Sequence, residues 1–348
     1  MKKKESTLSV FSTLLMAGLA LLCSSFPAAA ESANKTIVWK VGTLAPKGIG
    51  WASLVETVLA PALAKATDNT LSFKIFFGGI MGDDESVIAK MDQGQLEGAG
   101  LSGQGAILLC RELSVLQLPY MFAGYDEVDF VRSRMTPVFE QALKRRGVQL
   151  LAWIDQDFDR IYSMEKPMAR LSDFSGARVV CWSGFVERAL IEKLGATPVV
   201  LDVPEISQAI RSRRADVNIG PAIWMVGTQL HGVFRYVVDQ PVRYTPALIV
   251  VSDKAWTAVP EKYRERILEL RPEITRDFCQ GIRKDNERYL TAMVSYGVNR
   301  VVMAPENLRR MKEATSSIGH DLSGIQYPRE ILVELQEDLE AFRAARKK

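Results

Sequence analysis

Histidine is nearly absent from this chain, which has only His231 and His320 among 348 residues. Neither has further metal ligands nearby at the spacing of a zinc site, and the motifs G-x-S-x-G and H-E-x-x-H are both missing. We therefore predict that both histidines are structural or surface residues, that the protein needs no metal or other cofactor, and that it is not an enzyme. A hydrolase built on a pair of carboxylates stays open as an alternative, although no pair is marked by the sequence.

Cysteine is scarce as well. Cys110, Cys181 and Cys279 are the cysteines beyond residue 30, and they are far apart with no C-x-x-C pair. This spacing gives no zinc or iron–sulfur pattern. Two interpretations remain for an oxidising compartment: one disulfide with a free thiol, or buried thiols that are not bridged.

Net charge is also close to zero. The whole chain carries +3, and removing residues 1–30 takes away three lysines and one glutamate, which leaves 41 basic and 40 acidic residues. A balanced chain of this kind offers no basic surface to a nucleic acid or an anionic membrane, so we expect neither as a partner.

The first thirty residues have the order of a secretory signal peptide. Lysines at positions 2–4 precede an apolar stretch at 8–23, and small residues at 27–30 precede Glu31. The apolar stretch is shorter than the ~20 residues that span a bilayer, which argues against an uncleaved anchor. We predict cleavage after about Ala30 and a periplasmic location; lipid attachment at Cys23 is a third interpretation, made less favourable by the bulky Leu22.

Beyond residue 30, strand-like and helix-like segments alternate without repeats or low-complexity linkers, which indicates an α/β fold with mixed sheets. The segment from 260 to 284 and beyond is long and charged, as in an exposed helical strut. Strands are expected at 36–42, 71–77, 148–154, 177–182, 197–201 and 247–251, and helices at 51–65, 85–93, 125–146, 185–194, 204–214, 260–284, 305–311 and 328–347.

Several motifs follow one another along the chain: F-K-I-F-F-G-G-I-M-G-D-D-E at 73–85, L-P-Y-M-F at 118–122, L-S-D-F-S-G-A-R at 171–178, and G-A-T-P-V at 195–199 followed by the segment 205–216. In this order they resemble the DctP-type substrate-binding proteins of TRAP (tripartite ATP-independent periplasmic) transporters. The resemblance implies a two-lobed periplasmic-binding-protein fold, with mixed sheets flanked by helices and one long helix spanning both lobes. After a signal peptide at 1–30, we expect lobe I at 31–157 and 246–285, and lobe II at 158–245 and 286–348.

The same resemblance implies a function. The protein is expected to close around a small organic ligand, commonly an organic acid in this family, and to deliver it to the permease subunits of a TRAP transporter. A receptor that acts as a periplasmic sensor or lipid carrier is a further alternative, because sequence does not separate it from one that serves transport.

The sequence departs from the family at the residues that usually hold the acid. The family arginine that forms a bidentate pair with a carboxylate corresponds to Val180, and Arg178 stands two residues earlier on the strand. Ile219 and Gly220 replace a Glu and an Asn of the family pattern. Arg160 aligns with a second family arginine that often helps to hold the acid, although it could instead be neutralised by neighbouring aspartates.

Trp153, Trp182 and Trp224 lie in or beside the segments that build the family's cleft. Together with the lost polar anchors, they favour a ligand more hydrophobic than a C4 dicarboxylate. A conventional organic-acid receptor that uses Arg160 and Arg178 is the alternative. The expected ligand-binding residues are therefore Arg160, Val180, Trp182, Trp153, Gly220, Trp224 and Arg178.

Three aspartates alternate at Asp155, Asp157 and Asp159, so a regular strand would carry them on one face. Carboxylates so arranged suggest calcium, but the turn glycines and carbonyls of a calcium loop are missing. We favour a solvated cluster, or one paired with Arg160.

Overall fold

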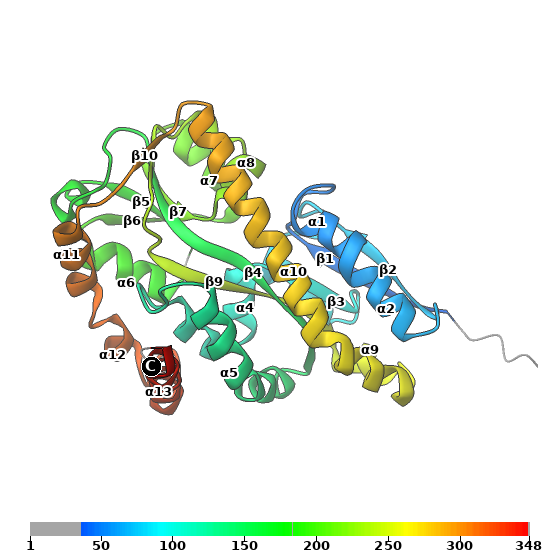
Figure 1. The fold of residues 1–348 in the computed structure, drawn as a ribbon. Helices are drawn as coiled ribbons and strands as arrows, with labels where there is room; N and C mark the ends of the chain where they lie inside the picture. Colours follow the sequence, from blue (N-terminus) through cyan, green and yellow to red (C-terminus); the bar gives the residue numbers. More distant parts are fainter. Residues whose placement is uncertain (1–35, 183, 347–348) are drawn as a thin grey trace, which may run out of the picture. The chain divides into compact units, whose positions relative to one another are not determined.

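The computed structural model describes residues 36–182 and 184–346 (Figure 1). The predicted signal peptide lies outside these residues. The strands are β1 Ile37–Thr43, β2 Leu71–Phe76, β3 Gly98–Leu101, β4 Val148–Ser163, β5 Arg178–Cys181, β6 Thr197–Val200, β7 Val217–Gly220, β8 Tyr236–Val238, β9 Arg243–Ser252 and β10 Asn299–Val301. The helices are α1 Trp51–Leu54, α2 Ala60–Ala66, α3 Asp84–Asp92, α4 Gly103–Leu109, α5 Tyr125–Arg145, α6 Phe185–Lys193, α7 Val203–Arg211, α8 Ala222–Gly227, α9 Asp253–Thr257, α10 Glu261–Ser295, α11 Pro305–Thr315, α12 Ile318–Leu322 and α13 Arg329–Arg346.

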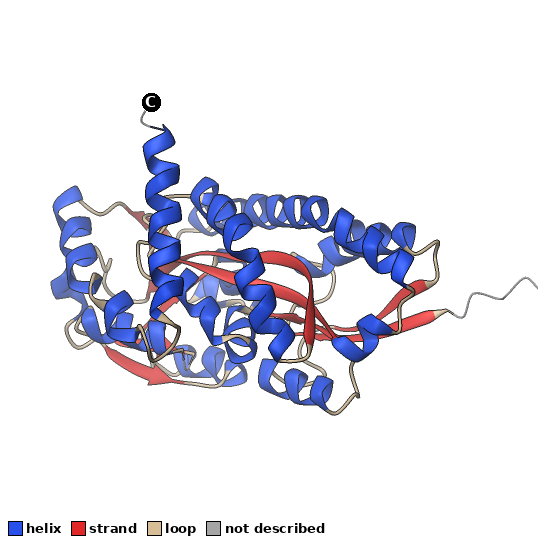
Figure 2. Ribbon diagram, turned by 90° about the horizontal axis from the view of Figure 1, so that it is seen from below, coloured by secondary structure: helices blue, strands red, loops and turns tan. Residues whose placement is uncertain are grey.

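One mixed sheet runs through the chain in the order β2-β1-β3-β9-β4-β7-β5-β6, with β8 and β10 off this path. The first three strands pair in parallel, β9 enters antiparallel to β3, and β4 pairs antiparallel with both β9 and β7. Helices cover both faces of the strands (Figure 2). The α/β fold with mixed strands and flanking helices that the sequence predicted is confirmed.

Strand β4 is the element that joins the two parts of the sheet. It has 16 residues; it pairs with β9 from Val148 to Asp159 and with β7 from Arg160 to Ser163. The sequence predicted only its first seven residues as a strand. The rest contains three aspartates, which are depleted in strands, and two of them, Asp155 and Asp159, are buried against arginines far away in the sequence.

Helix α10 packs against both parts, as predicted for the long helix (Figure 1). Its 35 residues place Ile274 and Phe278 in the apolar cluster under α2, and Leu290 and Met293 in the cluster under α7 and α8. One rigid element therefore supports both ends of the sheet. None of the described helices is long and apolar enough to cross a membrane.

The turn before α3 shows how one residue sets the start of a helix. Asp83 is the N-cap, and its Oδ1 accepts a hydrogen bond of 2.9 Å from the Ser86 N–H. Asp84 lies inside the first turn, where it is buried and accepts a hydrogen bond from the Ser102 hydroxyl.

Candidate functional site

The C-terminal halves of β4, β5 and β7 bring several sequence-predicted residues onto one face of the sheet. Arg160 pairs with Gly220 and Tyr162 with Asn218 across the β4–β7 ladder. Because side chains alternate along a strand, the members of each pair share a face. Val180 and Trp182 lie on this face too, while Val179 and Cys181 pack in the core on the other side.

Helix α8 completes this group. It starts immediately after β7, because Pro221 follows Gly220 and supplies the extended residue before the first turn. The Trp224 ring then meets the Trp182 ring edge to face, with centroids 4.8 Å apart. We call the set of Arg160, Tyr162, Val180, Trp182, Asn218, Gly220 and Trp224 the tryptophan cluster.

Four buried polar atoms of the tryptophan cluster have no hydrogen-bond partner within the described part of the chain. They are Tyr162 Oη, Trp182 Nε1, Trp224 Nε1 and Asn218 Oδ1. Leaving such a group unpaired costs about 1–3 kcal/mol. The three N–H and O–H groups are donors, so the cluster offers hydrogen bonds to an acceptor while its rings offer apolar contact.

Arg160 is the cation of the tryptophan cluster. Its Nε donates to the Asp239 carbonyl at 3.1 Å, and it has no ion-pair partner among residues 36–182 and 184–346. The direct ion pair with a neighbouring aspartate that the sequence allowed for Arg160 is therefore not formed, although the charge of Arg160 acts to lower the pKa of Asp157. Asp155 and Asp159 pair with other arginines, and Asp157 accepts a hydrogen bond from the Tyr125 hydroxyl.

The three aspartates of β4 are buried rather than solvated, and they do not form one cluster. The register against β9 shifts between Asp155 and Asp157, and Asp157 has a φ of +128°. This bulge breaks the alternation that would have placed all three on one face. No group of three or more acidic, histidine or cysteine side chains in the described residues is placed to hold a metal ion.

Asp155 is the centre of an ion-pair network that joins β4 to helices α5 and α10. Arg132 of α5 donates to its Oδ1 at 2.9 Å, Arg283 of α10 to its Oδ2 at 2.6 Å, and the Tyr244 hydroxyl to Oδ1 at 2.6 Å. Burial acts to raise the pKa of Asp155, but the two arginines outweigh it, and the pKa lies below its ordinary value. The network fastens α5 and α10 to the middle of β4.

A pocket of about 420 Å³ lies on the other side of the strands from the tryptophan cluster, between residues of the two expected lobes. We call it the interlobe pocket. Trp182 is the one member of the tryptophan cluster that lines it. The lining residues are Gln104, Ile107, Leu108, Arg111, Gln117, Gln156, Asp159, Trp182, Gly184, Phe185, Glu187, Ile219, Arg243, Thr245 and Gln326.

An ion-pair network forms the buried end of the interlobe pocket. Arg243 donates to Asp159 Oδ2 and to Glu187 Oε1, each at 2.8 Å, and the Thr245 hydroxyl donates to Asp159 Oδ2 at 2.7 Å. Burial raises the pKa of both carboxyls, although Arg243 opposes the shift. With both carboxylates ionised, the three groups sum to one negative charge.

The loop before α1 and helix α8 meet beside the tryptophan cluster. A β-carbon at Gly50 would lie 2.2 Å from Ile223 Cδ1, and one at Gly227 would lie 3.7 Å from Pro46 Cγ. The backbone N–H of Ile223 donates to Asn286 Oδ1 of α10 at 2.9 Å. Residues of both expected lobes thus touch in this structure, with α10 beneath them.

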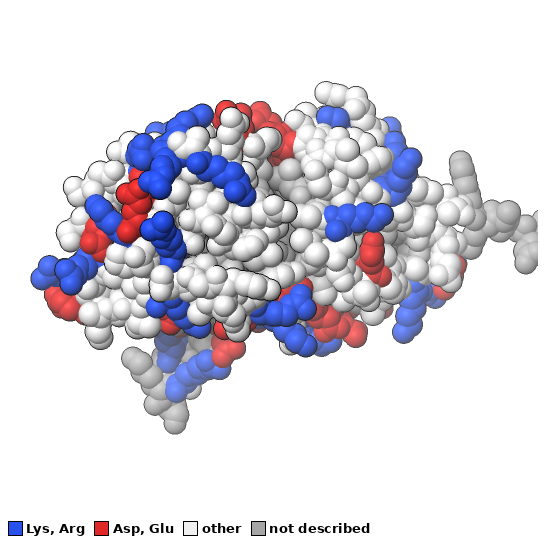
Figure 3. Space-filling model, turned by 90° about the horizontal axis from the view of Figure 1, so that it is seen from above, with Lys and Arg blue, Asp and Glu red and all other residues white. Residues whose placement is uncertain are grey.

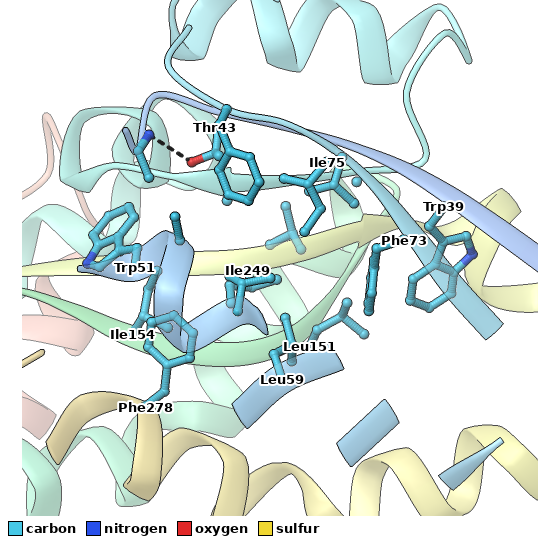
Figure 4. A pocket seen from close by; sticks show the side chains of 18 residues that line it. Trp39, Thr43, Trp51, Leu59, Phe73, Ile75, Leu151, Ile154, Ile249 and Phe278 are labelled. Carbon is cyan, nitrogen blue, oxygen red and sulfur yellow. Dashed lines mark hydrogen bonds between the residues drawn. The ribbon is translucent and has the colours of Figure 1, made fainter. Parts of the chain in front are cut away.

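A second, much smaller cavity lies under β1 and β2. Its volume is about 30 Å³, and side chains such as Trp39, Phe73 and Ile249 surround it (Figure 4). The one hydrogen bond drawn there joins the Ala45 N–H to Thr43 Oγ1 at 3.2 Å. A space of this size holds one water molecule at most, so we assign it to the core.

Two predicted site residues are not brought to the tryptophan cluster. Trp153 packs against Phe139 and donates from Nε1 to Thr136 Oγ1 at 3.0 Å. Arg178 lies at the start of β5, half-exposed, and pairs with Asp216 at 3.0 Å. Their roles in ligand binding remain predictions, whereas Arg160, Val180, Trp182, Gly220 and Trp224 lie together.

Sequence reasoning missed several residues of this region. Tyr162 and Asn218 are within the segments that define the tryptophan cluster, and alternation from Arg160 and Gly220 would have found them. Arg243 and Glu187 carry no motif, because they meet Asp159 only through the fold.

The three cysteines are buried. Cys110 and Cys279 are free thiols, and burial raises the pKa of Cys279 to about 12. His231 is half-buried and His320 exposed. On the face seen in Figure 3, acidic and basic side chains are interspersed around a broad uncharged area, so no field of one sign covers this face.

Comparison with known proteins supplies the family. Residues 50–323 match the model of the bacterial extracellular solute-binding proteins, family 7, called DctP. The chain belongs to the DctP family. It is 25% identical over 295 residues to the C4-dicarboxylate-binding periplasmic protein DctP of Rhodobacter capsulatus, covering 84% of this chain and 86% of the relative. It is 22% identical over 251 residues to the C4-dicarboxylate-binding protein DctB of Bacillus subtilis, covering 70% of each.

Solved structures with the DctP fold align over most of both chains. The sugar acid binding protein DctPAm of Advenella mimigardefordensis, in complex with galactonate, gives a TM-score of 0.81 at 18% identity and covers 88% of this chain and 99% of its own. A TRAP periplasmic solute binding protein of Desulfovibrio salexigens with bound orotic acid gives 0.81 at 15%, covering 88% and 99%. At these identities the likeness shows the fold. The chain is a DctP-type solute-binding protein, and it has the two-lobed α/β fold expected from the sequence.

Proposed function

We propose that this receptor binds a small organic ligand more hydrophobic than a C4 dicarboxylate and delivers it to the permease of a TRAP transporter. The ligands named for its relatives are organic acids, among them C4 dicarboxylates, galactonate and orotic acid. We therefore expect an organic ligand for this chain as well. The residues of this chain favour a ligand that is less polar than those acids.

The surroundings of Val180 carry the proposal. Val180 is fully buried in the apolar cluster that contains Leu201, Ile206 and Met225. A carboxylate placed beside Val180 without a paired cation would cost several kcal/mol. The space of the family asparagine is also taken, because a β-carbon at Gly220 would lie 3.1 Å from Asn218 Nδ2.

The interlobe pocket has the size and lining for an apolar ligand. Its 420 Å³ fall within the range of small-molecule sites, and Ile107, Leu108, Trp182, Phe185 and Ile219 contribute apolar surface. Its buried arginine, Arg243, is already engaged by two carboxylates. Trp182 lines this pocket and is also a member of the tryptophan cluster.

Closure and delivery follow from the proposed lobe boundaries. With lobe I at 31–157 and 246–285 and lobe II at 158–245 and 286–348, the crossings fall in β4, at β9 and in α10. The lobes would then rotate about these elements and enclose the ligand, while the loop before α1 meets α8. Secretion by a signal peptide cleaved after about Ala30 would place the receptor in the periplasm, next to the permease subunits.

One observation favours a second candidate, a conventional organic-acid receptor. Arg160 has no carboxylate partner in the described chain and sits beside the unpaired donors of Tyr162, Trp182 and Trp224. A single carboxylate at this place would receive a charge-assisted hydrogen bond. Arg178, the other arginine of this alternative, is occupied by Asp216.

Calorimetry with defined ligands distinguishes the two candidates. We expect 3-phenylpropionate or 3-phenyl-1-propanol to bind more tightly than succinate to protein freed of carried ligand. Micromolar binding of succinate with no preference for the aromatic compounds would overturn the proposal. Arg160→Gln should abolish that succinate binding if Arg160 is the anchor, whereas the matched variant Arg178→Gln should leave it unchanged.

Native mass spectrometry of protein purified from cells gives an independent test. A carried aromatic or lipid-like molecule supports the proposal, and a carried dicarboxylate contradicts it.

A further inference from the structure

The buried end of the interlobe pocket contains an acceptor that nothing satisfies. Asp159 is fully buried and lines the pocket, and its Oδ1 has no hydrogen-bond partner within the described residues. Its other oxygen, Oδ2, accepts from both Arg243 and Thr245. An unpaired buried carboxylate oxygen is among the costliest groups a protein interior can contain, so its position needs an explanation.

The neighbours of Asp159 do not provide the missing donor. Arg243 donates from Nη2 to Glu187 Oε1, and Glu187 Oε2 in turn accepts a hydrogen bond of 2.5 Å from the Trp182 backbone N–H. Gln156 beside Asp159 on β4 uses its Oε1 to accept the Gly103 N–H at 2.7 Å. Ile219 faces the same space and has no polar side-chain atom.

The charge of this network also restricts what can approach. Arg243 lies between the carboxyl groups of Asp159 and Glu187, and with both ionised one negative charge remains at this end of the pocket. A ligand carboxylate here would meet that charge in a buried place, where like charges repel strongly. Arg111 is the other cation among the lining residues; it is exposed and donates to the Ile325 carbonyl.

We infer that the interlobe pocket selects ligands whose inner end donates a hydrogen bond to Asp159. The donor class is a hydroxyl, amide N–H or ammonium group on an otherwise apolar body, which packs against Ile107, Leu108, Trp182 and Phe185. This inference rests on the proposed function and sharpens it, because it assigns chemistry to one end of the ligand.

Two neutral probes that differ only in the donor test the inference directly. We would measure 3-phenyl-1-propanol and its methyl ether by calorimetry at pH 8 with the full-length secreted protein, freed of carried ligand. The ether would leave Asp159 Oδ1 unpaired, so we expect the alcohol to bind at least about tenfold more tightly. 3-Phenylpropylamine then shows whether the preferred donor is charged, since binding of the amine at least as tight as that of the alcohol indicates an ammonium group.

The variant Asp159→Asn provides the reciprocal test. The Asn oxygen can keep the hydrogen bonds from Arg243 and Thr245, which turns the amide N–H₂ toward the pocket in place of the carboxylate oxygen. The alcohol-to-ether ratio should therefore fall to about one. Asp68→Asn, at an exposed pair with Arg266, is the matched control and should keep the wild-type ratio.

The outcomes separate this inference from the proposed function. If the wild type binds the alcohol and the ether equally, or prefers the ether, the inference is overturned. The proposal of an apolar ligand survives either result. This wild-type comparison decides the matter even if Asp159→Asn does not fold. If the wild type binds none of the three probes, the inference and the apolar-ligand proposal both fail.

Discussion

Gly50 and Ile223 touch so closely that a β-carbon at residue 50 would lie 2.2 Å from Ile223 Cδ1. Gly50 also has a φ of +52°, a conformation that residues other than glycine rarely adopt. The close contact and the positive φ both occur where the loop before α1 meets α8.

Gly50→Ala should therefore loosen this contact, because the methyl group needs the space of Ile223 and the backbone is strained. We expect faster amide hydrogen exchange in residues 44–50 and 222–227 than in the wild type. Gly48→Ala is the matched control, since Gly48 has a φ of +81° but nothing within 4 Å of the added carbon. Equal exchange in the two variants would show that the contact with Ile223 contributes nothing.

Removing the carboxylate of Asp155 should be strongly destabilising. Asp155→Ala leaves the buried Arg132 and the partly buried Arg283 without a partner that each contacts within 3 Å. Loss of one member of a buried ion pair costs about 3–5 kcal/mol in the free energy of unfolding. Asp68→Ala removes an exposed pair and should cost less than about 1 kcal/mol, as urea denaturation can measure.

Asp157 should make stability depend on pH. Burial raises its pKa from the ordinary 3.8 to about 7; the Tyr125 hydroxyl and Arg160 oppose this, and Asp155 adds to it. Between about pH 4 and pH 7 the folded protein keeps a proton that the unfolded chain releases, so stability falls as the pH rises through this window.

Asp157→Asn should flatten this dependence, because the amide does not titrate. As the pH rises, the free energy of unfolding of the wild type should fall more steeply than that of the variant. The difference between the two slopes is expected to reach about 1.4 kcal/mol per pH unit. Asp126→Asn, at an exposed ion pair with Arg346, should retain the wild-type slope. Parallel slopes for wild type and Asp157→Asn would contradict the assignment.

Arginine at position 180 should not be accommodated. Val180→Arg places an unpaired charge in an apolar cluster, at a cost of several kcal/mol. Val200→Arg on the neighbouring strand β6 is the control, since Val200 is 43% exposed and should tolerate the change. A stable Val180→Arg protein that gained succinate binding would count against the apolar-ligand proposal.

The sequence was most informative about elements that are stabilised by local pattern. Helix α5 was expected at 125–146 and spans Tyr125–Arg145, and α6 was expected at 185–194 and spans Phe185–Lys193. Strands β3 and β7 were missed. Each has four residues and contains glycine, and each becomes a strand by pairing with strands distant in the sequence.

The candidate site was predictable to a similar extent. Position in the motifs pointed to Arg160, Val180, Trp182, Gly220 and Trp224, and these residues lie together in the tryptophan cluster. The interlobe pocket could not be predicted from the sequence, because its ion pairs join residues 56 and 84 positions apart. No local pattern indicates that Arg243 will stand between Asp159 and Glu187.

Strand β4 has a consequence for how such a receptor can diversify. Since one strand pairs with β9 at its beginning and with β7 at its end, no single break in the gene separates two self-sufficient halves. A recombinant that took its first half from one receptor and its second half from another would have to rebuild the middle of a shared strand. New ligand preferences in this lineage should therefore arise by point substitution at the strand ends rather than by exchange of modules.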